Sequence, residues 1–489
     1  MKKIIIFLIT FLLFSACKIP NAYAETKFYE GEYIPNIWMN KKNPNDGLIY
    51  YNQARFIRES STNNIAYCLE PFVYFDENTI YNPSTNHTTL TESKKQLISL
   101  IAYYGYGYQN HTDPKWYAIT QMMIWETVEP NAKYYFSSVK NGPAEQMLTS
   151  EKNEINQLIK NFRTDTFLNN KTYTIVENTT FQQHDFNTVI SNYTSTDNRL
   201  NINKIMNMAE TVKLSKGTYT FTIERKTNDY NKPVFFYQSN TGQDIMDIGD
   251  VPTKTNKFTV NVIETSLTIN KIDKDTKTNN PQGKGTLNDA KFQLYTKENV
   301  FIQDIELDEN GTAKIKNLPF NSYYIIETKA STGYKLNTKK HSFTISESQP
   351  NQNVTIENEV IKGKLIIHKE YGTNENFQKE PNISFNIYDD ENNLIKTITT
   401  NQEGTAEITL PYGNYYIEQL TTTEGYQKIE KDYIEIISDI EIIKNYKNYK
   451  IEVPNTHSES FLEKLLKYIK EILCLEKSFL LHYCYYSIY

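Results

Sequence analysis

The sequence predicts a multidomain protein in which an α+β domain is followed by two all-β sandwiches. Between residues 89 and 162, apolar side chains recur at helical spacing. From residue 173 onward, short stretches alternate between apolar and polar side chains, as strands do. After Glu264 a block of about 90 residues occurs twice, which is close to the size of one β-sandwich domain.

The first 24 residues have the pattern of a secretion signal. A Met-Lys-Lys start precedes an apolar run that ends at Phe14, and Ala-Tyr-Ala closes the segment at Ala24. We therefore expect an exported protein whose mature chain starts at Glu25. A rival interpretation takes Phe-Ser-Ala-Cys as a lipidation motif, with lipid attached to Cys17.

Charge and cysteine content narrow the classes of function. The chain has 52 Lys and Arg against 58 Asp and Glu, a net charge of −6. This acidic balance argues against a nucleic-acid partner. Of the four cysteines, Cys68 alone lies in the body of the chain, between Cys17 and the pair Cys474 and Cys484. Because exported proteins normally pair their cysteines, Cys68 is either a buried apolar residue or a reactive group.

The front domain is expected to mix helices and strands. Thr-Leu-Thr-Glu at 89–92 resembles a capping box that opens a first helix. A second helix carries Trp116, Ile119 and Met123 on one face, and a third is expected over residues 143–162. Strict alternation predicts strands later in the domain, at 218–223 and 258–262.

The two copies of the repeat correspond segment by segment. Residues 267–271 return as 365–369, 291–295 as 384–388, 311–313 as 404–406, and 333–334 as 425–426. Each copy consists of short alternating segments separated by Gly, Pro, Asn and Asp. This pattern is typical of a β-sandwich.

Both repeats place a lysine on the apolar face of the first strand and an asparagine on the apolar face of the last. The pairs are Lys271 with Asn358, and Lys369 with Asn445. A buried, isolated amine favours the neutral, nucleophilic form, and a buried carboxylic acid such as Glu327 can shuttle protons. A lysine that extends along the strand to reach water is the structural alternative.

These residues, with Glu-x-x-Ala-x-x-Gly-Tyr at 327–334, resemble the Cna-B-type (SpaA-like, prealbumin-fold) repeats of Gram-positive surface proteins. The resemblance implies an autocatalytic isopeptide bond between Lys271 and Asn358, assisted by Glu327. The second repeat departs from the pattern. Gln419 aligns with the expected Glu, and Glu418 would face outward. A Lys369–Asn445 bond is therefore the less favoured of the two.

A second resemblance concerns Cys68. Tyr-Cys-Leu-Glu at 67–70 and Thr-Gln-Met-Met-Ile-Trp at 120–125 resemble the motifs of thioester domains in Gram-positive adhesins. That family joins the Cys sulfur to the side chain of a later Gln, with loss of ammonia. The best partner is Gln243, in Gln-Asp-Ile-Met, with Gln238 as the alternative. The resemblance also implies that three residues line the site: Thr120, Gln121 and Trp125.

The resulting hypothesis is a covalent adhesin rather than an enzyme. An amine of a partner protein, expected to be a lysine, would attack the Gln acyl carbon and release the Cys68 thiol. One alternative is a secreted enzyme in which Cys68 is the nucleophile and His87, His111 or His184 the base. The other is a structural stalk or minor pilin that binds non-covalently. The scattered histidines predict no metal site, and no cofactor is expected.

The C-terminal region resembles a sortase signal. Val453, Pro454, Asn455 and Thr456 precede a His where such signals have Gly, which implies attachment to peptidoglycan and a cell-wall location. Residues 461–481 predict an amphipathic helix with too many charges to span a bilayer. Coincidence and an altered tail are the alternatives. The expected domains are 1–24 (signal), 25–265 (thioester domain), 266–360 and 361–452 (repeats), and 453–489 (sorting-like tail).

Overall fold

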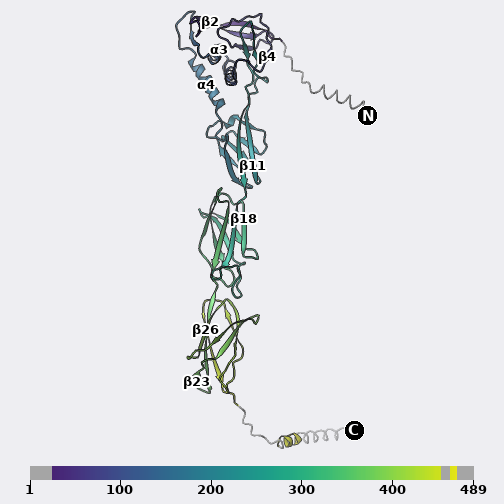
Figure 1. Cartoon of the computed structure of the whole chain (residues 1–489), viewed down its shortest axis with the longest axis vertical. Helices are drawn as coiled ribbons and strands as arrows, with labels where there is room; N and C mark the ends of the chain where they lie inside the picture. Colours follow the sequence, from purple (N-terminus) through teal and green to yellow (C-terminus); the bar gives the residue numbers. More distant parts are fainter. Residues whose placement is uncertain (1–24, 453–462, 471–489) are drawn as a thin grey trace, which may run out of the picture. The chain divides into compact units, whose positions relative to one another are not determined.

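The computed structural model describes residues 25–452 and 463–470, and these divide at Glu264 into two compact units (Figure 1). The predicted secretion signal, the lipidation motif and the sortase-like motif lie outside the described residues. Of the expected C-terminal helix, residues 463–470 are described; they are helical and exposed. Within the described part of the chain, no helix is both long and apolar enough to cross a membrane.

The first unit begins with a seven-stranded sheet in the order β4-β12-β13-β3-β2-β1-β5. Its strands are β1 (Phe28–Lys42), β2 (Ile49–Glu59), β3 (Ile65–Cys68), β4 (Pro83–Ser84), β5 (Lys133–Ser137), β12 (Phe236–Tyr237) and β13 (Ile245–Asp247). The pairing of β1 with β2 shifts register twice between Glu30 and Trp38. The sheet thus joins the start of the unit, which includes Cys68, to a segment almost 180 residues later, since β13 pairs with β3.

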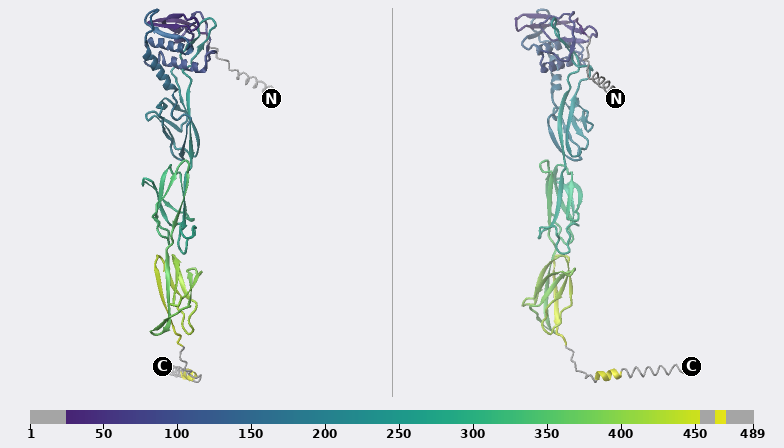
Figure 2. Two further views of the ribbon diagram at one scale, coloured as in Figure 1. Left: turned by 60° about the vertical axis from the view of Figure 1, so that its left-hand side comes forward. Right: turned by 45° about the vertical axis from the view of Figure 1, so that its right-hand side comes forward.

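Three helices pack with this sheet: α2 (Glu92–Tyr104), α3 (Lys115–Val128) and α4 (Thr149–Arg163). Figure 2 shows helices and sheet as separate layers. The helix α2 begins two residues later than the predicted capping box implies, because Thr91 is the N-cap and its hydroxyl accepts a bond from Lys94 N. The helix α3 is buried along almost its whole length, from Trp116 to Trp125, so it forms the centre of the domain core.

A second hydrophobic core occupies the rest of this unit. It lies between the sheet β7-β10-β9 and the sheet β6-β14-β11-β8, with Phe221, Phe258 and Val260 at its centre. Its elements are β6 (Thr172–Val176), β7 (Gln182–His184), the 3-10 helix η1 (Ile190–Asn192), β8 (Thr194–Ser195), β9 (Leu200–Asn203), β10 (Met208–Thr211), β11 (Gly217–Arg225) and β14 (Lys254–Ile263). The region expected as one domain, 25–265, therefore contains two cores, and only the first surrounds Cys68.

The second unit holds two β-sandwiches, one for each repeat, which confirms the predicted fold class. In the first repeat, the sheets β18-β15-β21 and β17-β16-β19-β20 enclose one core. Its strands are β15 (Ser266–Asp273), β16 (Lys291–Thr296), β17 (Phe301–Glu306), β18 (Thr312–Lys316), β19 (Asn321–Lys329), β20 (His341–Ile345) and β21 (Asn351–Asn358).

The second repeat has the same plan, with the sheet β25-β24-β27-β28 facing a sheet in which β22 pairs with β23, β26 and β29. Its strands are β22 (Lys362–Thr373), β23 (Asn376–Lys379), β24 (Ser384–Asp389), β25 (Leu394–Thr399), β26 (Thr405–Pro411), β27 (Gly413–Gln419), β28 (Asp432–Ile436) and β29 (Glu441–Tyr449). The added hairpin strand β23 distinguishes it from the first repeat.

In each sandwich the first and last strands are parallel neighbours. Lys271 on β15 is paired with Ile356 on β21, and Lys369 on β22 is paired with Tyr446 on β29. In a strand, the residue two positions further on faces the same side. Asn358 and Asn448 therefore hold equivalent positions, each two residues beyond the partner of the lysine.

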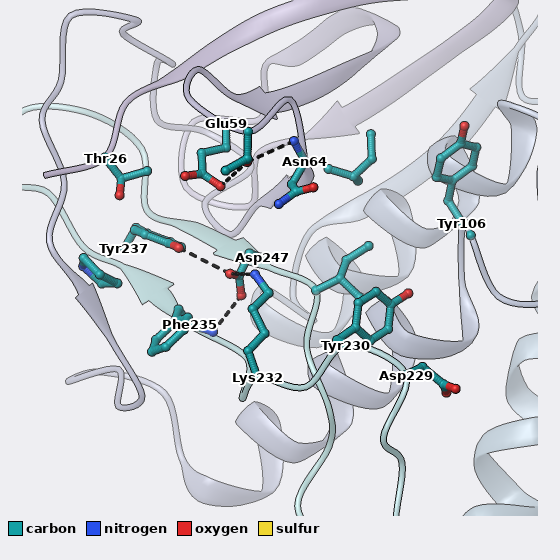
Figure 3. A pocket seen from close by; sticks show the side chains of 15 residues that line it. Thr26, Glu59, Asn64, Tyr106, Asp229, Tyr230, Lys232, Phe235, Tyr237 and Asp247 are labelled. Carbon is teal, nitrogen blue, oxygen red and sulfur yellow. Dashed lines mark hydrogen bonds and ion pairs between the residues drawn. The ribbon is translucent and has the colours of Figure 1, made fainter. Parts of the chain in front are cut away.

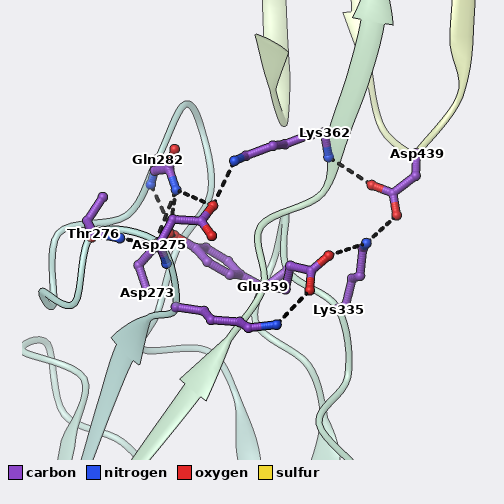
Figure 4. A network of polar contacts seen from close by, with 10 residues as sticks. Asp273, Asp275, Thr276, Gln282, Lys335, Glu359, Lys362 and Asp439 are labelled. Atoms are coloured by element: carbon purple, nitrogen blue, oxygen red, sulfur yellow. Dashed lines mark hydrogen bonds and ion pairs between the residues drawn. The ribbon is translucent and has the colours of Figure 1, made fainter. Parts of the chain in front are cut away.

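Polar contacts surround the connection between the two sandwiches (Figure 4). Lys362 Nζ lies 2.7 Å from Asp275 Oδ2, and its backbone N–H donates to Asp439. Lys335 Nζ contacts both Asp439, at 2.5 Å, and Glu359, at 2.7 Å. These side chains are roughly half exposed, so the contacts add little stability individually but set a preferred arrangement of the polar groups.

Candidate functional site

Cys68 is the last residue of β3 and lines a small cavity of about 150 Å³. Ile245 on β13 is its cross-strand partner, and Leu69 N donates to Asp244 O at 2.8 Å. This pairing brings the segment that carries Gln243 beside Cys68. The lining side chains include Lys41, Arg55, Cys68, Phe75, Tyr117, Gln121, Trp125 and Gln243. Two residues predicted from separate motifs thus share one cavity, with Cys68 6% exposed and Gln243 4% exposed.

The Gln of the second motif fixes the backbone of Cys68. The side chain of Gln121 accepts a hydrogen bond from Cys68 N at 2.8 Å and donates one to Cys68 O at 2.7 Å. A buried amide that satisfies both backbone groups of one residue leaves that residue little freedom. Gln121 therefore positions the Cys68 sulfur, while its own amide stays occupied.

A second set of bonds holds Gln243. Its Nε2 donates to Glu70 O, and its backbone carbonyl accepts from Tyr81 Oη at 2.7 Å. The next residue, Asp244, donates from its backbone to Glu70 Oε2 at 2.8 Å and contacts His87 Nε2 at 3.0 Å. The loop on both sides of Gln243 is therefore tied to the segment that follows Cys68.

The alternative Gln238 lies elsewhere. Its side chain exchanges two hydrogen bonds with Thr88 and does not line the Cys68 cavity. The geometry favours Gln243 as the partner of Cys68.

Two of the three residues predicted to line the site do line the cavity. Gln121 and Trp125 line the cavity, but Thr120 does not. Its hydroxyl donates to Trp116 O at 2.6 Å, within the helix α3. A Cβ on Gly105 would lie 2.1 Å from the Thr120 hydroxyl, so Thr120 fills the close approach between α2 and α3. Successive side chains of a helix point in different directions, so Thr120 packs toward Gly105 while Gln121 contacts Cys68.

Burial dominates the electrostatics of the cavity. It raises the pKa of the Cys68 thiol to about 12, although the positive charges of Lys41 and Arg55 oppose the shift. Burial also lowers the pKa of the Lys41 amine to about 8. Lys41 Nζ lies 4.2 Å from the centre of the Trp125 ring. Sequence reasoning did not identify Lys41, because Met39, Asn40 and Lys41 are buried in succession and a polar residue in such a run does not reveal its surroundings by alternation.

The three histidines considered as bases for an enzyme do not line the cavity. His87 is bound to Asp244, as described above. His111 stacks on Trp116 with ring centres 3.5 Å apart, and His184 is exposed on β7. Within the described residues, no cluster of three or more His, Cys, Asp or Glu could hold a metal ion.

A larger cavity of about 770 Å³ lies elsewhere in the first unit (Figure 3). Its most buried carboxylate, Asp247, pairs with Lys232 Nζ at 2.5 Å and accepts bonds from Phe235 N and Tyr237 Oη. Desolvation raises the pKa of Asp247 despite these partners. None of the predicted site residues lines this cavity, and its central charge is already neutralised.

In the first repeat, the structure brings the three predicted residues together inside the core. Lys271 Nζ lies 2.7 Å from Glu327 Oε1, and both side chains are at most 1% exposed. Asn358 Nδ2 donates to the same carboxylate at 2.8 and 2.9 Å. Desolvation lowers the pKa of Lys271, which favours the neutral amine. Glu327 thus touches both the amine and the amide nitrogen.

The second repeat requires two corrections. Asn445 is exposed, so it does not face Lys369; Asn448 is buried there instead, 1% exposed. The carboxylate in contact with both side chains is Glu380, whose Oε2 lies 2.9 Å from Lys369 Nζ and accepts from Asn448 Nδ2 at 3.3 Å. Lys369 and Glu380 have fully buried side chains, and desolvation lowers the pKa of Lys369.

Gln419 occupies the position expected from the alignment but has another role. It is buried, and its amide bonds Thr421 O and Ile429 N. By the alignment of 291–295 on 384–388, Glu380 corresponds to Leu287 of the first repeat. The two repeats therefore supply a carboxylate to an equivalent Lys–Asn pair from two different strands or loops.

Comparisons with known proteins agree with this organisation. A family model described as a thioester domain matches residues 65–165. A second, SpaA, described as a prealbumin-like fold domain, matches residues 265–360 and 364–456. No curated protein matches the chain in sequence.

Among solved structures, the Bacillus anthracis TIE protein is 18% identical, with a TM-score of 0.34, over 87% of this chain and 84% of that one. The thioester domain of the Staphylococcus aureus TIE protein is 19% identical, with a TM-score of 0.38, over 49% of this chain and 99% of that one. GBS52, a minor pilin of Streptococcus agalactiae, is 16% identical, with a TM-score of 0.22, over 40% of this chain and 100% of that one. On the family matches and the site geometry, the chain is a thioester-domain protein whose thioester domain is followed by two prealbumin-like repeats.

Proposed function

We propose that this protein is a surface adhesin that forms one covalent bond with an amine of a partner protein. The observation that carries the proposal is the shared cavity of Cys68 and Gln243, held in place by Gln121 and Glu70. The Cys68 sulfur would replace the side-chain nitrogen of Gln243, so that a C–S bond forms, the C–N bond breaks and ammonia leaves. Cys68 and Gln243 are 6% and 4% exposed, and a thioester between side chains buried to this degree is shielded from water and thus from hydrolysis.

The bond to the partner follows from the same chemistry. A lysine amine attacks the acyl carbon of Gln243, an amide bond forms, and Cys68 leaves as the thiol. Each molecule reacts once, so the protein consumes its thioester rather than turning over as an enzyme does. Among the residues that the structure describes, the buried indole N–H of Trp125 has no hydrogen-bond partner, and it is a donor available to a carbonyl oxygen in the cavity.

We further propose that the repeats are cross-linked internally. In the first repeat the neutral Lys271 amine attacks the side-chain carbonyl carbon of Asn358. Glu327 takes a proton from the attacking amine and delivers it to the leaving nitrogen, so that ammonia departs. Its contacts with both nitrogens, at 2.7 and 2.8 Å, support this shuttle.

In the second repeat, Lys369, Asn448 and Glu380 support the same reaction, with Glu380 again in contact with both nitrogens.

Export, cell-wall attachment through the sortase-like motif, and a Gram-positive surface location complete the proposal. They agree with the role of an adhesin, whose partner is a protein on a host or neighbouring surface. No observation favours a Cys-dependent enzyme, since the candidate histidines do not line the Cys68 cavity.

Intact mass spectrometry tests the thioester. We expect Cys68→Ala and Gln243→Ala proteins each to be one ammonia heavier than the unaltered protein, after correction for the substitution. The matched control is Gln238→Ala, which removes the other candidate glutamine and should leave the ammonia deficit intact. A Cys68→Ala protein with an unchanged deficit would refute the thioester.

A further inference from the structure

Lys41 carries a buried amine that lines the cavity of Cys68 and Gln243. Its side chain belongs to β1 and the residue is 5% exposed. Within the described residues, Lys41 Nζ forms no ion pair with a carboxylate; its close neighbour is the face of Trp125, at 4.2 Å. Burial of a lone ammonium is costly, which makes such a lysine in a cavity a candidate functional group.

Few other groups in the cavity can exchange a proton near neutral pH. Glu30 of β1 is paired with Arg55 of β2, and an Arg does not give up its proton. Tyr117 of α3 donates to Ala66 O and accepts from Ile57 N, and its pKa is raised far above the ordinary value. Tyr74 is 84% exposed.

The strands beside Lys41 add no base either. Its cross-strand partners are Tyr50 on β2 and Tyr134 on β5. Tyr134 donates to Trp125 O, and burial raises its pKa. Glu70, whose backbone carbonyl accepts from Gln243 Nε2, does not line the cavity, and its carboxylate accepts from Asp244 N. Lys41 is therefore the group of this site that is suited to accept and return a proton.

We propose that Lys41 is the general base and acid of acyl transfer between Cys68 and Gln243. This inference rests on the proposed thioester function. When an external amine attacks the Gln243 acyl carbon, the N–C bond forms and the amine nitrogen passes one proton to neutral Lys41 Nζ. The C–S bond then breaks, and Lys41 returns the proton to the sulfur. The products are an amide and the Cys68 thiol, and Lys41 is neutral again.

The pKa values of Cys68 and Lys41 explain why the reaction needs a proton carrier. A Cys68 thiol with a pKa of about 12 leaves poorly as a bare thiolate. A protonated amine with a pKa of about 8 is acidic enough to supply the missing proton and basic enough to remove one from the attacking nitrogen. Formation of the thioester uses the same transfers, from the Cys68 thiol to Lys41 and then to the departing ammonia.

The test compares three full-length variants after intact mass has established the thioester in the unaltered protein. Lys41→Met keeps an apolar stem against Trp125 but removes the base. Lys41→Arg keeps the charge over the ring but cannot act as a base near neutral pH. Lys42→Met is the matched control, since Lys42 is the exposed neighbour. The probe is an amine of low basicity that stays unprotonated over the whole pH range, so that its own titration does not enter the profile.

For the unaltered protein and Lys42→Met, we expect the rate of amine incorporation to rise with pH and level off above about pH 8. For both Lys41 variants, we expect rates about 100-fold lower and no inflection there, once the rate is divided by the fraction of molecules that show the ammonia deficit. Unchanged rates in Lys41→Met, or full activity in Lys41→Arg, would overturn the proposal. A Lys41–Gln243 cross-link in the unaltered protein, found by peptide mapping, would also overturn it, because Lys41 would then be the nucleophile. Absence of the ammonia deficit from the unaltered protein would instead refute the thioester itself.

Discussion

At the scale of single residues, the thioester site depends on groups that burial has moved away from their ordinary chemistry. Cys68 and Lys41 share a cavity in which burial raises the free energy of the charged form of each side chain. Gln121 and Glu70 provide fixed hydrogen bonds on either side. Cys68 and Lys41 thus set the reactivity of the site, whereas Gln121 and Glu70 fix the positions of Cys68 and Gln243.

Lys41 should make the stability of its domain depend on pH. Its pKa falls from 10.5 in the unfolded chain to about 8 in the folded one. Between these values the unfolded chain binds more protons, so stability rises with pH across that window. Below pH 8 the buried charge costs about 3 kcal/mol. We therefore expect Lys41→Met to stabilise the domain at pH 7 by up to about this amount and to remove the rise.

Denaturant unfolding at several pH values, followed by tryptophan fluorescence, measures this effect. The chain has three tryptophans, Trp38, Trp116 and Trp125, and all lie in this domain. Cys68→Ala serves as the background, so that thioester hydrolysis at high pH does not interfere. A lower stability of Lys41→Met at pH 7 would contradict the expected cost of the buried charge.

At the scale of elements, the second repeat shows that a strand face cannot always be read from alternation. Ile442 and Ile443 are adjacent in β29, so the period of two fits either phase. The observed phase buries Asn448 and exposes Asn445. In β21 the run Val354, Ile356 and Asn358 allows one phase, and the sequence placed Asn358 correctly.

Two further site residues, Glu380 and Lys41, could not be predicted from the sequence, each for its own reason. Glu380 follows the short strand β23, where no period exists to read, and its partner Lys369 lies on a strand that precedes it. Lys41 lies in a run of three buried residues, Met39 to Lys41, so alternation of polar and apolar side chains does not mark its face. By contrast, Cys68, Gln121 and Gln243 belong to local motifs, and Lys271 lies in a regular alternating strand. The sequence therefore predicts motifs and strands that alternate clearly, but it does not predict side chains in segments where alternation fails or is absent.

The face of β29 can be tested by paired substitutions. We expect Asn448→Ala to abolish the ammonia loss of the second repeat, because it removes the acyl group. Asn445→Ala should leave that loss unchanged, because Asn445 is exposed. Mass spectrometry of peptides that span Lys369 distinguishes the two. A cross-linked peptide that survives in Asn448→Ala would show that another residue reacts.

An exchange of Glu380 and Gln419 tests which residue supplies the carboxylic acid for the cross-link of the second repeat. Glu380→Gln should prevent the bond, since Gln cannot shuttle a proton. The double variant Glu380→Gln with Gln419→Glu recreates the arrangement of the first repeat and should restore some cross-linking. Without the cross-link we expect the repeat to lose about 4 kcal/mol of stability, by analogy with a disulfide that closes a similar loop. Full cross-linking in Glu380→Gln alone would exclude the proposed role of Glu380.

At the scale of the whole molecule, three sites are expected to lose one ammonia each: Cys68 with Gln243, Lys271 with Asn358, and Lys369 with Asn448. We expect the intact protein to be lighter than its sequence by three ammonias. Treatment with methylamine should add one methylamine, because the two isopeptide bonds are stable amides and only the thioester is an activated acyl group. Addition at more than one site would contradict this assignment.

The parallel pairing of first and last strands has a mechanical consequence. A pull on the two ends of a repeat is applied to β15 and β21, or to β22 and β29, and each pair contains one proposed cross-link. Tension would then pass from one end strand to the other through a covalent bond near the strand ends. The intervening strands would carry none of the load. A repeat built this way cannot extend by unfolding between its linked residues. Force on an attached cell would therefore be transmitted to the covalent bond with the partner protein without extension of the two sandwiches.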